Sequence, residues 1–350
     1  MAVLYVTGNR PGAGKTALAA ALASRLVGAG RRPVLVRPLR PNAAAASDPD
    51  VALFQQVVPG APNTEAPPLA VTLDTLSADT TLPDRVRERV AAASVGREPT
   101  IVEGLDGLDD HDPWALASAS IATALDARVV LVLDYGRDLS DAAAAAARRR
   151  YGNRLAGVVI NRVPHHAIHD ATARLSPALQ GGGLAVLGIV PEDRRMAAPS
   201  VAQVAEHLGA AFRVLDDLDD PGAGLRSLVE HFMVGGSPLD NGAYVFSRRE
   251  NKAVLVRGDR PDLQMAALET STTCLVLTGG REPVQYATYH AGLRQVPAML
   301  VGGPTLEVME ALGTVGERAS VHSPLKVERF ADLLDRHEDM PALLAAAGGP

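Results

Sequence analysis

The residues best suited to chemistry lie near the start of the chain, in the glycine-rich stretch GNRPGAGKT at residues 8–16. Glycines let backbone N–H groups turn inward around phosphate oxygens, and a helix that begins directly after them adds the partial positive charge of its N-terminus. Lys15 is spaced to reach the terminal phosphates of a nucleotide, and the hydroxyl of Thr16 to contact Mg²⁺. A β-rich run precedes the stretch and an alanine-rich helical segment follows it. This order predicts a P-loop for a nucleoside triphosphate rather than a glycine-rich turn with a chance Lys-Thr pair.

The spacing of this loop is one residue longer than usual. Gly8 lies six residues before Gly14, and Asn9 stands where the common motif has a glycine. Arg10 lies five residues before Lys15. Two roles are open for it: a solvated loop arginine, or a cation that reaches the phosphates of a partner subunit across a dimer. The loop residues that we expect to contact the nucleotide are Gly8, Asn9, Gly12, Ala13, Gly14, Lys15, Thr16 and Ala17.

Two acidic residues are candidates for holding the Mg²⁺ ion. Glu103 ends a predicted strand and precedes Gly104, which places its carboxylate at the carboxyl edge of the sheet, beside the loop. Asp50 lies at the start of a predicted helix after the second strand. Each acid could instead act only as a helix cap or as a partner of the helix dipole, and this alternative is strongest for Asp48 and Asp50.

The elements that must position these residues follow a regular alternation. Runs of Val, Ile and Leu alternate with alanine-rich helical segments over about the first two hundred residues, which is typical of a parallel sheet covered by helices. Strands are predicted at residues 3–7, 33–37, 100–103, 128–134, 155–161 and 184–190, and helices at 16–26, 141–150 and 201–208.

A second alternation begins after a charged stretch that closes on Pro221-Gly222. Its predicted strands are residues 253–256, 273–277 and 298–301, and its predicted helices are residues 262–269, 284–293 and 306–312. We therefore predict an α/β protein: a P-loop NTPase domain with a parallel sheet and flanking helices at residues 1–214, and a smaller α/β domain at residues 225–350.

Composition limits the classes of function. The chain has 350 residues, of which 47% are hydrophobic and 21% charged, and this length favours two domains over one. Its formal net charge of -6 supplies no basic field for a polyanion, which argues against a nucleic-acid binder. The single cysteine, Cys274, can form no disulfide within the chain, and no apolar run approaches the roughly 20 residues of a membrane span. We expect a cytoplasmic protein.

Taken together, the motifs of about the first 210 residues resemble the dethiobiotin synthetase family of P-loop enzymes. The matching features are the long spacing of the loop, the dipeptide Arg37-Pro38 after the second strand, Asp50, Glu103-Gly104 and Asn161. The resemblance implies that Thr16, Asp50 and Glu103 surround Mg²⁺ and that Asn161 reads the base. Arg162 and Pro191 complete the predicted nucleotide-binding residues.

The chain departs from that family at two places. The family has a catalytic lysine where this sequence has Arg37, which keeps the positive charge and changes its geometry. The family's glycine-rich substrate segment is replaced by LDGLDDHD at residues 105–112. The candidate catalytic residues are Lys15, Arg10, Arg37 and Glu103.

A longer resemblance covers almost the whole chain. The stretches NRVP at residues 161–164, LGIVPEDR at 187–194 and APSV at 198–201 are similar to the synthetase-like N-terminal region of long-form phosphate acetyltransferases. VRGDR at 256–260 and LTGG at 277–280 resemble the two signatures of the DRTGG domain, which follows that region in those enzymes. Because the sequence has no counterpart of the acetyltransferase domain, we expect no acetyltransferase activity.

Both signatures of the second domain follow predicted strands, so they should meet at one edge of its sheet. Glycine amides and a guanidinium suit a phosphate or a carboxylate, and the predicted ligand-contacting residues are Gly258, Asp259, Arg260, Thr278, Gly279 and Gly280. The alternative is that the glycines only make tight turns while Asp259 pairs with Arg260. The cluster HHAIHD at residues 165–170 has the spacing of a zinc helix, but without a separated third ligand we expect polar helix caps there.

Three functions remain open at this point. The leading hypothesis is a Mg-ATP-binding sensor or switch with weak ATPase activity and a regulatory DRTGG domain, linked by resemblance to acetyl-phosphate and acetyl-CoA metabolism. The rival is a ligase-like enzyme that phosphorylates a carboxylate or carbamate, which requires a substrate pocket at Arg37 and residues 106–112. The third is an interaction module with a vestigial P-loop. We expect a homodimer, because a nucleotide-binding P-loop of this kind is often buried at an interface.

Overall fold

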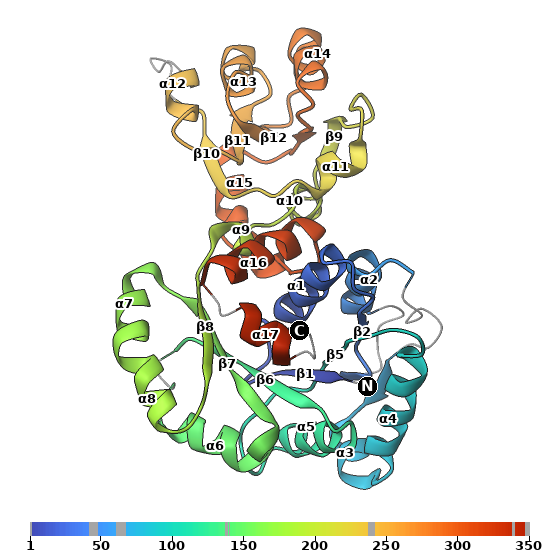
Figure 1. Cartoon of the computed structure of the whole chain (residues 1–350). Helices are drawn as coiled ribbons and strands as arrows, with labels where there is room; N and C mark the ends of the chain where they lie inside the picture. Colours follow the sequence, from blue (N-terminus) through green and yellow to red (C-terminus); the bar gives the residue numbers. More distant parts are fainter. Residues whose placement is uncertain are drawn as a thin grey trace. The chain divides into compact units, whose positions relative to one another are not determined.

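The chain forms two compact units (Figure 1). The structure is a computed structural model that describes residues 2–41, 48–60, 68–136, 139, 141–236, 242–337 and 340–346. Unit 1 comprises Met1–Glu192 together with Val321–Pro350, and unit 2 comprises Asp193–Ser320. The second unit is therefore inserted into the first.

A parallel sheet forms the centre of unit 1. Its strands are β1 (Val3–Gly8), β2 (Val34–Val36), β5 (Thr100–Glu103), β6 (Arg128–Asp134), β7 (Leu155–Val163) and β8 (Val186–Pro191). They lie in the order β2-β5-β1-β6-β7-β8, and each neighbouring pair is parallel. The apolar runs that predicted these strands are buried on both faces, as a helix-covered parallel sheet requires. Because β1 lies between β5 and β6, the loop after β1 is flanked by the ends of both strands.

Helices cover both faces of this sheet (Figure 1). One face carries α1 (Lys15–Gly28), α2 (Pro49–Val57), α16 (Pro324–His337) and α17 (Met340–Ala346), and the other carries α4 (Leu82–Ala93), α5 (Pro113–Ala124), α6 (Asp141–Tyr151) and α8 (Ser176–Gly181). Smaller elements are the parallel pair β3 (Leu39–Pro41) and β4 (Leu69–Val71), with α3 (Leu73–Ala78) and α7 (Ile168–Asp170). The predicted fold class of the first domain is confirmed.

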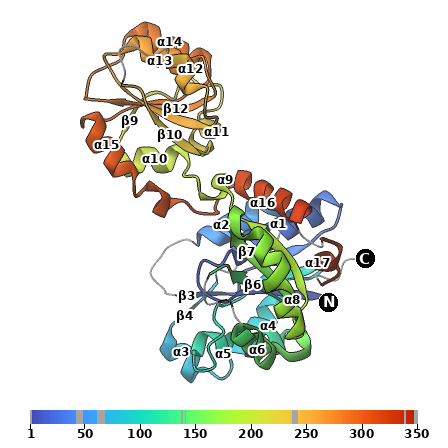
Figure 2. The ribbon, with the colours of Figure 1, turned by 90° about the vertical axis from the view of Figure 1, so that its left-hand side faces the viewer.

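Unit 2 has its own sheet and its own core (Figure 2). The strands β10 (His231–Val234), β11 (Lys252–Arg257), β12 (Thr272–Thr278) and β13 (Ala298–Leu300) are parallel, and β9 (Ala211–Val214) joins β13 as an antiparallel edge. Its helices are α9 (Arg194–Ala197), α10 (Val201–Leu208), α11 (Pro221–Arg226), α12 (Gly242–Phe246), α13 (Pro261–Leu268), α14 (Gln285–Leu293) and α15 (Thr305–Leu312). The predicted second α/β domain is confirmed as a fold.

The boundaries of the two units differ from those that the sequence suggests. Val201 and Val204 of α10 belong to the same core cluster as Val276 of β12, so α10 is part of unit 2. The Pro221-Gly222 turn signal begins α11, which Asp220 caps, and is not a linker. A turn signal is local, and it does not distinguish a loop within a domain from a connection between domains.

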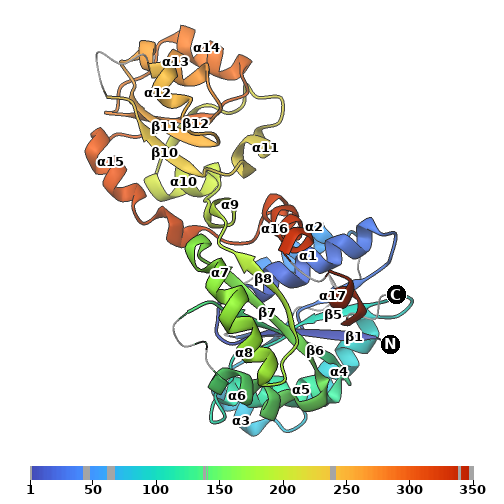
Figure 3. The same cartoon turned by 60° about the vertical axis from the view of Figure 1, so that its left-hand side comes forward.

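The end of the chain also differs from the prediction, because it belongs to unit 1. Helix α16 packs against α1, α2 and β8 (Figure 3). Arg25 of α1 forms ion pairs with Asp332 at 2.9 Å and with Asp335 at 2.5 Å. Phe330 of α16 is buried. An amphipathic helix has an apolar face in either position, so its pattern alone does not reveal which domain it covers.

None of the helices within the described ranges is long and apolar enough to cross a lipid bilayer.

Candidate functional site

Residues 8–16 form a loop at the carboxyl edge of the sheet, between β1 and α1. Gly14 is the N-cap of α1 and has a φ of 107°, a left-handed conformation that glycine adopts without strain. A Cβ at this position would also collide with the amide of Asn161. Among the described residues no side chain caps α1, and uncapped N–H groups at a helix start are suited to bind an anion.

Two asparagines fasten the loop to the neighbouring strands. The backbone N–H of Asn9 donates to the carbonyl of Val132 at 3.0 Å, and its side-chain oxygen accepts from the N–H of Asp134 at 3.0 Å. Asn161, only 4% exposed, donates its amide to the carbonyl of Ala13 at 2.8 Å. The structure thus shows Asn161 holding the loop, and its base-reading role stays a prediction.

Asp134 is a site residue that the sequence analysis missed. This buried acid at the end of β6 accepts from Arg162 at 2.6 Å and also pairs with Arg10. Arg162 has a φ of 60°, at an irregularity in the pairing of β7. The strand-end position that selected Glu103 would also have selected Asp134. Arg10, whose side chain is 58% exposed, is paired within its own chain, and its role across a dimer stays a prediction.

Lys15 and Thr16 meet the carboxylate that the sequence placed beside them. Thr16 donates its hydroxyl to Glu103 Oε1 at 3.1 Å, and Lys15 Nζ lies 3.9 Å from the same oxygen. Lys15 also donates to Asp106 Oδ2 at 2.6 Å. Burial raises the pKa of Asp106, and the charge of Lys15 opposes that rise. Asp106 is therefore a direct ion-pair partner of Lys15.

Arg37 lies between Glu103 and two acids that follow β2, Asp48 and Asp50. Its NH1 lies 3.2 Å from Glu103 Oε1 and pairs with Asp50, and its Nε lies 3.4 Å from Asp48 Oδ2. Asp48 caps α2 by accepting from the N–H groups of Asp50 and Val51, at 3.0 and 3.4 Å. The cap alternative thus holds for Asp48, whereas the side chain of Asp50 faces Arg37.

The donor set fits Mg²⁺. Thr16, Glu103 and Asp50 supply a hydroxyl and carboxylate oxygens, the ligands that Mg²⁺ prefers. Glu103 Oε2 is buried and has no hydrogen-bond partner within the part of the chain that the structure describes. The same part contains no group of three or more His, Cys, Asp and Glu side chains arranged for a metal. Mg²⁺ commonly binds one or two carboxylates and completes its shell with phosphates and water.

A cavity of about 420 Å³ adjoins the loop. Lys15, Arg37 and Asp106 supply charged groups to its wall, and Trp114 and Leu108 supply apolar surface. Gly107 holds the 105–112 segment to the loop by donating to the carbonyl of Gly8 at 2.9 Å. The rival ligase hypothesis requires a pocket at this place, and the structure has one.

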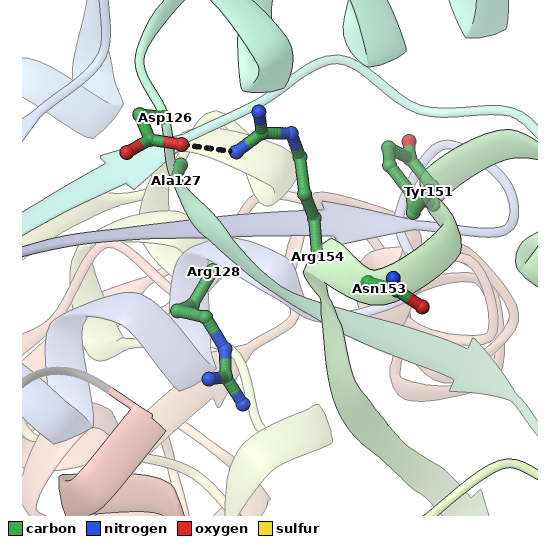
Figure 4. A pocket seen from close by; sticks show the side chains of 6 residues that line it. All are labelled: Asp126, Ala127, Arg128, Tyr151, Asn153 and Arg154. Carbon is green, nitrogen blue, oxygen red and sulfur yellow. Dashed lines mark hydrogen bonds and ion pairs between the residues drawn. The ribbon is translucent and has the colours of Figure 1, made fainter.

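A second cavity, of about 490 Å³, lies at the amino ends of β6 and β7, away from the loop (Figure 4). Arg154 points toward Asp126 and pairs with it at 2.6 Å, and Arg128 points the other way. None of the predicted nucleotide-binding residues lines it. The predicted nucleotide site at the loop edge stays a prediction.

The segment that begins at Val321 brings His322 to the site and buries Lys326 nearby in the sequence. His322 Nε2 lies 2.7 Å from Asp50 Oδ1, and burial lowers the pKa of His322 although Glu103 and Asp48 oppose that change. Lys326 is 1% exposed, and its ammonium has no hydrogen-bond partner among the described residues. Sequence reasoning missed both residues, which belong to no motif and lie some 300 positions from the loop.

In unit 2 the two predicted signatures lie side by side. Gly258 N–H donates to the carbonyl of Thr278 at 3.1 Å, and a Cβ at Gly258 would collide with the carbonyl of Arg281. The charged residues are paired differently from the alternative that the sequence suggested: Arg260 binds Asp262 at 2.7 and 2.9 Å, and Asp259 binds Arg257. Each acid pairs with the arginine two residues before it. The ligand role of the signatures stays a prediction.

Comparison with known proteins agrees with this geometry. A model of an AAA domain, AAA_26, matches residues 2–200, and a model of the DRTGG domain matches residues 203–315. The ATP-dependent dethiobiotin synthetase BioD of Streptomyces avermitilis is 32% identical over 217 residues, which cover 55% of this chain and 84% of that protein. The chain belongs to the dethiobiotin synthetase-like AAA domain family. In this chain the P-loop domain is joined to a DRTGG domain.

One further relative and one solved structure were compared with the chain. The phosphate acetyltransferase of Pseudomonas putida is 25% identical over 277 residues, which cover 74% of this chain. The match spans 39% of the acetyltransferase's own length. Among solved structures, the MinC:MinD cell division protein complex of Aquifex aeolicus aligns with a TM-score of 0.36 at 17% identity. The alignment covers 56% of this chain and 83% of the matched chain. The predicted resemblance to the N-terminal region of phosphate acetyltransferases is confirmed.

The buried ammonium of Lys326 in the P-loop domain generates a pH prediction. Burial lowers the pKa of Lys326 from its ordinary value of 10.5 to about 8. Below pH 8 the buried amine of the folded protein is charged, which lowers the free energy of unfolding. Between pH 8 and 10.5 the folded protein loses this proton while the unfolded chain keeps it, so the free energy of unfolding rises with pH in this window. We expect Lys326→Met to raise the free energy of unfolding at pH 7 by about 2 kcal/mol, and this gain to shrink between pH 8 and 10.

Urea denaturation of wild type and Lys326→Met at several pH values measures this difference. Glu328→Gln, an exposed change on the same helix, is the control and should leave the stability unchanged. A gain that stays constant from pH 7 to pH 10 would contradict a lowered pKa for Lys326.

Proposed function

We propose that the P-loop domain binds ATP with Mg²⁺, hydrolyses it slowly, and acts as a sensor or switch with the DRTGG domain as its regulatory partner. The observation that carries the proposal is the convergence of Lys15, Thr16 and Glu103 at the uncapped N-terminus of α1. Mg²⁺ would neutralise charge on the transferring phosphate. Lys15 would exchange Asp106 for a phosphate, and Thr16 with Glu103 and Asp50 would hold the ion.

The relatives support the nucleotide and the metabolic setting of this proposal. The dethiobiotin synthetase is ATP-dependent by name, and the acetyltransferase relative favours a link to acetyl-phosphate and acetyl-CoA metabolism. In this chain the DRTGG match at residues 203–315 follows the AAA domain match at residues 2–200, and the acetyltransferase relative aligns over 74% of the chain.

Calorimetry with Mg-ATP, Mg-GTP and acetyl-CoA tests this function. We expect wild type to bind Mg-ATP and Lys15→Ala to lose affinity by about tenfold or more, because a charge-assisted contact to phosphate is removed. Arg128→Ala, which changes an exposed arginine at the opposite edge of the sheet, is the matched control. Equal affinity of Mg-ATP for wild type and Lys15→Ala would refute a phosphate site at this loop.

We also propose a homodimer in which Arg10 of one subunit reaches the phosphates of the other, after exchanging Asp134 for phosphate. In that case ATP turnover per chain rises with protein concentration as dimers form. We expect Arg10→Ala to abolish this rise, while Arg128→Ala keeps it. The measurement is the rate of ADP release per chain over a wide range of protein concentration. A wild-type rate per chain that does not depend on concentration would argue against a role of Arg10 at the partner subunit's phosphates.

The cavity beside the loop favours a second candidate function, phosphoryl transfer to a small acid. A carboxylate or carbamate in this cavity would meet Lys15 and Arg37, with Trp114 against its apolar part. Its oxygen would attack the γ-phosphorus, the bond to ADP would break, and an acyl or carbamoyl phosphate would form.

Metabolite-stimulated ADP release separates this function from the sensor. We expect a panel of short carboxylic acids, and of amines supplied with bicarbonate, to contain a stimulating compound. Trp114→Ala should then raise the concentration of that compound needed for half-maximal stimulation by about tenfold, because it removes apolar contact area. Trp114→Phe keeps most of that area and should behave like wild type. Stimulation that is equal in wild type and Trp114→Ala would place the substrate elsewhere.

A further inference from the structure

The DRTGG domain interrupts the P-loop domain in the sequence, and the chain returns from it beside a predicted Mg²⁺ ligand. β8 ends at Pro191, a predicted nucleotide-binding residue, and the chain leaves unit 1 after Glu192. It returns at Val321, and the next residue, His322, contacts Asp50. The first residues after the DRTGG domain therefore lie at the proposed Mg²⁺ edge.

The contact engages one specific oxygen of the acid. His322 Nε2 lies 2.7 Å from Asp50 Oδ1, whereas Arg37 pairs with Asp50 Oδ2. A carboxylate accepts and does not donate, so His322 contributes the N–H of this hydrogen bond. The Asp50 side chain is 13% exposed and that of His322 is 28% exposed, so the contact is partly shielded from water. Two donors from distant segments thus fix the orientation of Asp50.

Anchoring of α16 does not require this hydrogen bond. Arg25 binds Asp332 and Asp335 near the far end of the helix, and Val327 and Phe330 are buried along it. These contacts hold α16 against α1 independently of His322. The hydrogen bond to Asp50 is therefore available for a role in the site.

We propose that His322 is a positioning residue of the Mg-nucleotide site, which holds the Asp50 carboxylate in the orientation that binds the ion. The inference rests on the proposed function, in which Asp50 is a Mg²⁺ ligand. Partners that orient a metal-binding carboxylate affect metal affinity by about 10- to 100-fold when they are removed. The site of the P-loop domain is then completed by the segment that follows the DRTGG domain in the sequence.

Binding of a fluorescent nucleotide, mant-ATP, at a series of Mg²⁺ concentrations tests the role of His322. We expect His322→Ala to raise the Mg²⁺ concentration for half-maximal enhancement of binding by about tenfold, and to leave binding in EDTA unchanged. His322→Gln presents an amide N–H in place of Nε2 and should restore the wild-type value to within about threefold. His337→Ala, which changes an exposed histidine at the C-terminal end of α16, is the control and should match wild type.

The outcomes distinguish failure of the His322 proposal from failure of the proposed Mg-ATP binding. If His322→Ala and His337→Ala need the same Mg²⁺ concentration, His322 does not position the metal ligand. Equal loss of affinity with and without Mg²⁺ in both His322→Ala and His322→Gln would show an effect on the fold alone and would also overturn the proposal. Wild-type protein that binds mant-ATP without any effect of Mg²⁺, or does not bind it, would instead overturn the proposed function itself, and this arm is measured first.

Discussion

The carboxylates of Asp48, Asp50 and Glu103 are buried around one guanidinium, that of Arg37. Burying carboxylates at one edge of a sheet costs several kcal/mol each unless an opposite charge and hydrogen bonds accompany them. A guanidinium offers five N–H donors in a rigid plane, so it can meet several acids at once, which a compact ammonium does less well. The arginine that departs from the dethiobiotin synthetase pattern is the group on which this edge of the P-loop domain depends.

The remaining parts of the site are connected through these acids. Glu103 also accepts from Thr16, so the first turn of α1 and the strand end of β5 share one carboxylate with Arg37. Asp50 brings in His322, and through it the last segment of the chain. On the other side of the loop, Asp134 performs a similar task by joining Arg10 to Arg162. The loop thus lies between two charged clusters, each centred on strand ends next to β1.

Several features of this protein could be predicted from its sequence. The P-loop, its strand and its helix depend on local spacing, and residues 8–16 carry all of that information. The parallel sheets follow from apolar runs alternating with helical segments, because a strand buried on both faces must be apolar throughout. Glu103 was found because strand ends of a parallel sheet share one edge, and the same rule brought the two signatures of the DRTGG domain together.

Other features were decided only by the tertiary structure. The order β2-β5-β1-β6-β7-β8 determines which strand ends flank the loop, and no local pattern in the sequence encodes this order. For this reason the sequence does not predict Asp134 as a site residue or the pairing of Arg37 with three acids. The return of α16 to the P-loop domain, with His322 and Lys326, depends on which apolar face it covers. The loop and the fold class can be read from the sequence, because both arise from neighbours along the chain. The partners of the loop were decided by the packing, because they are brought together across hundreds of residues.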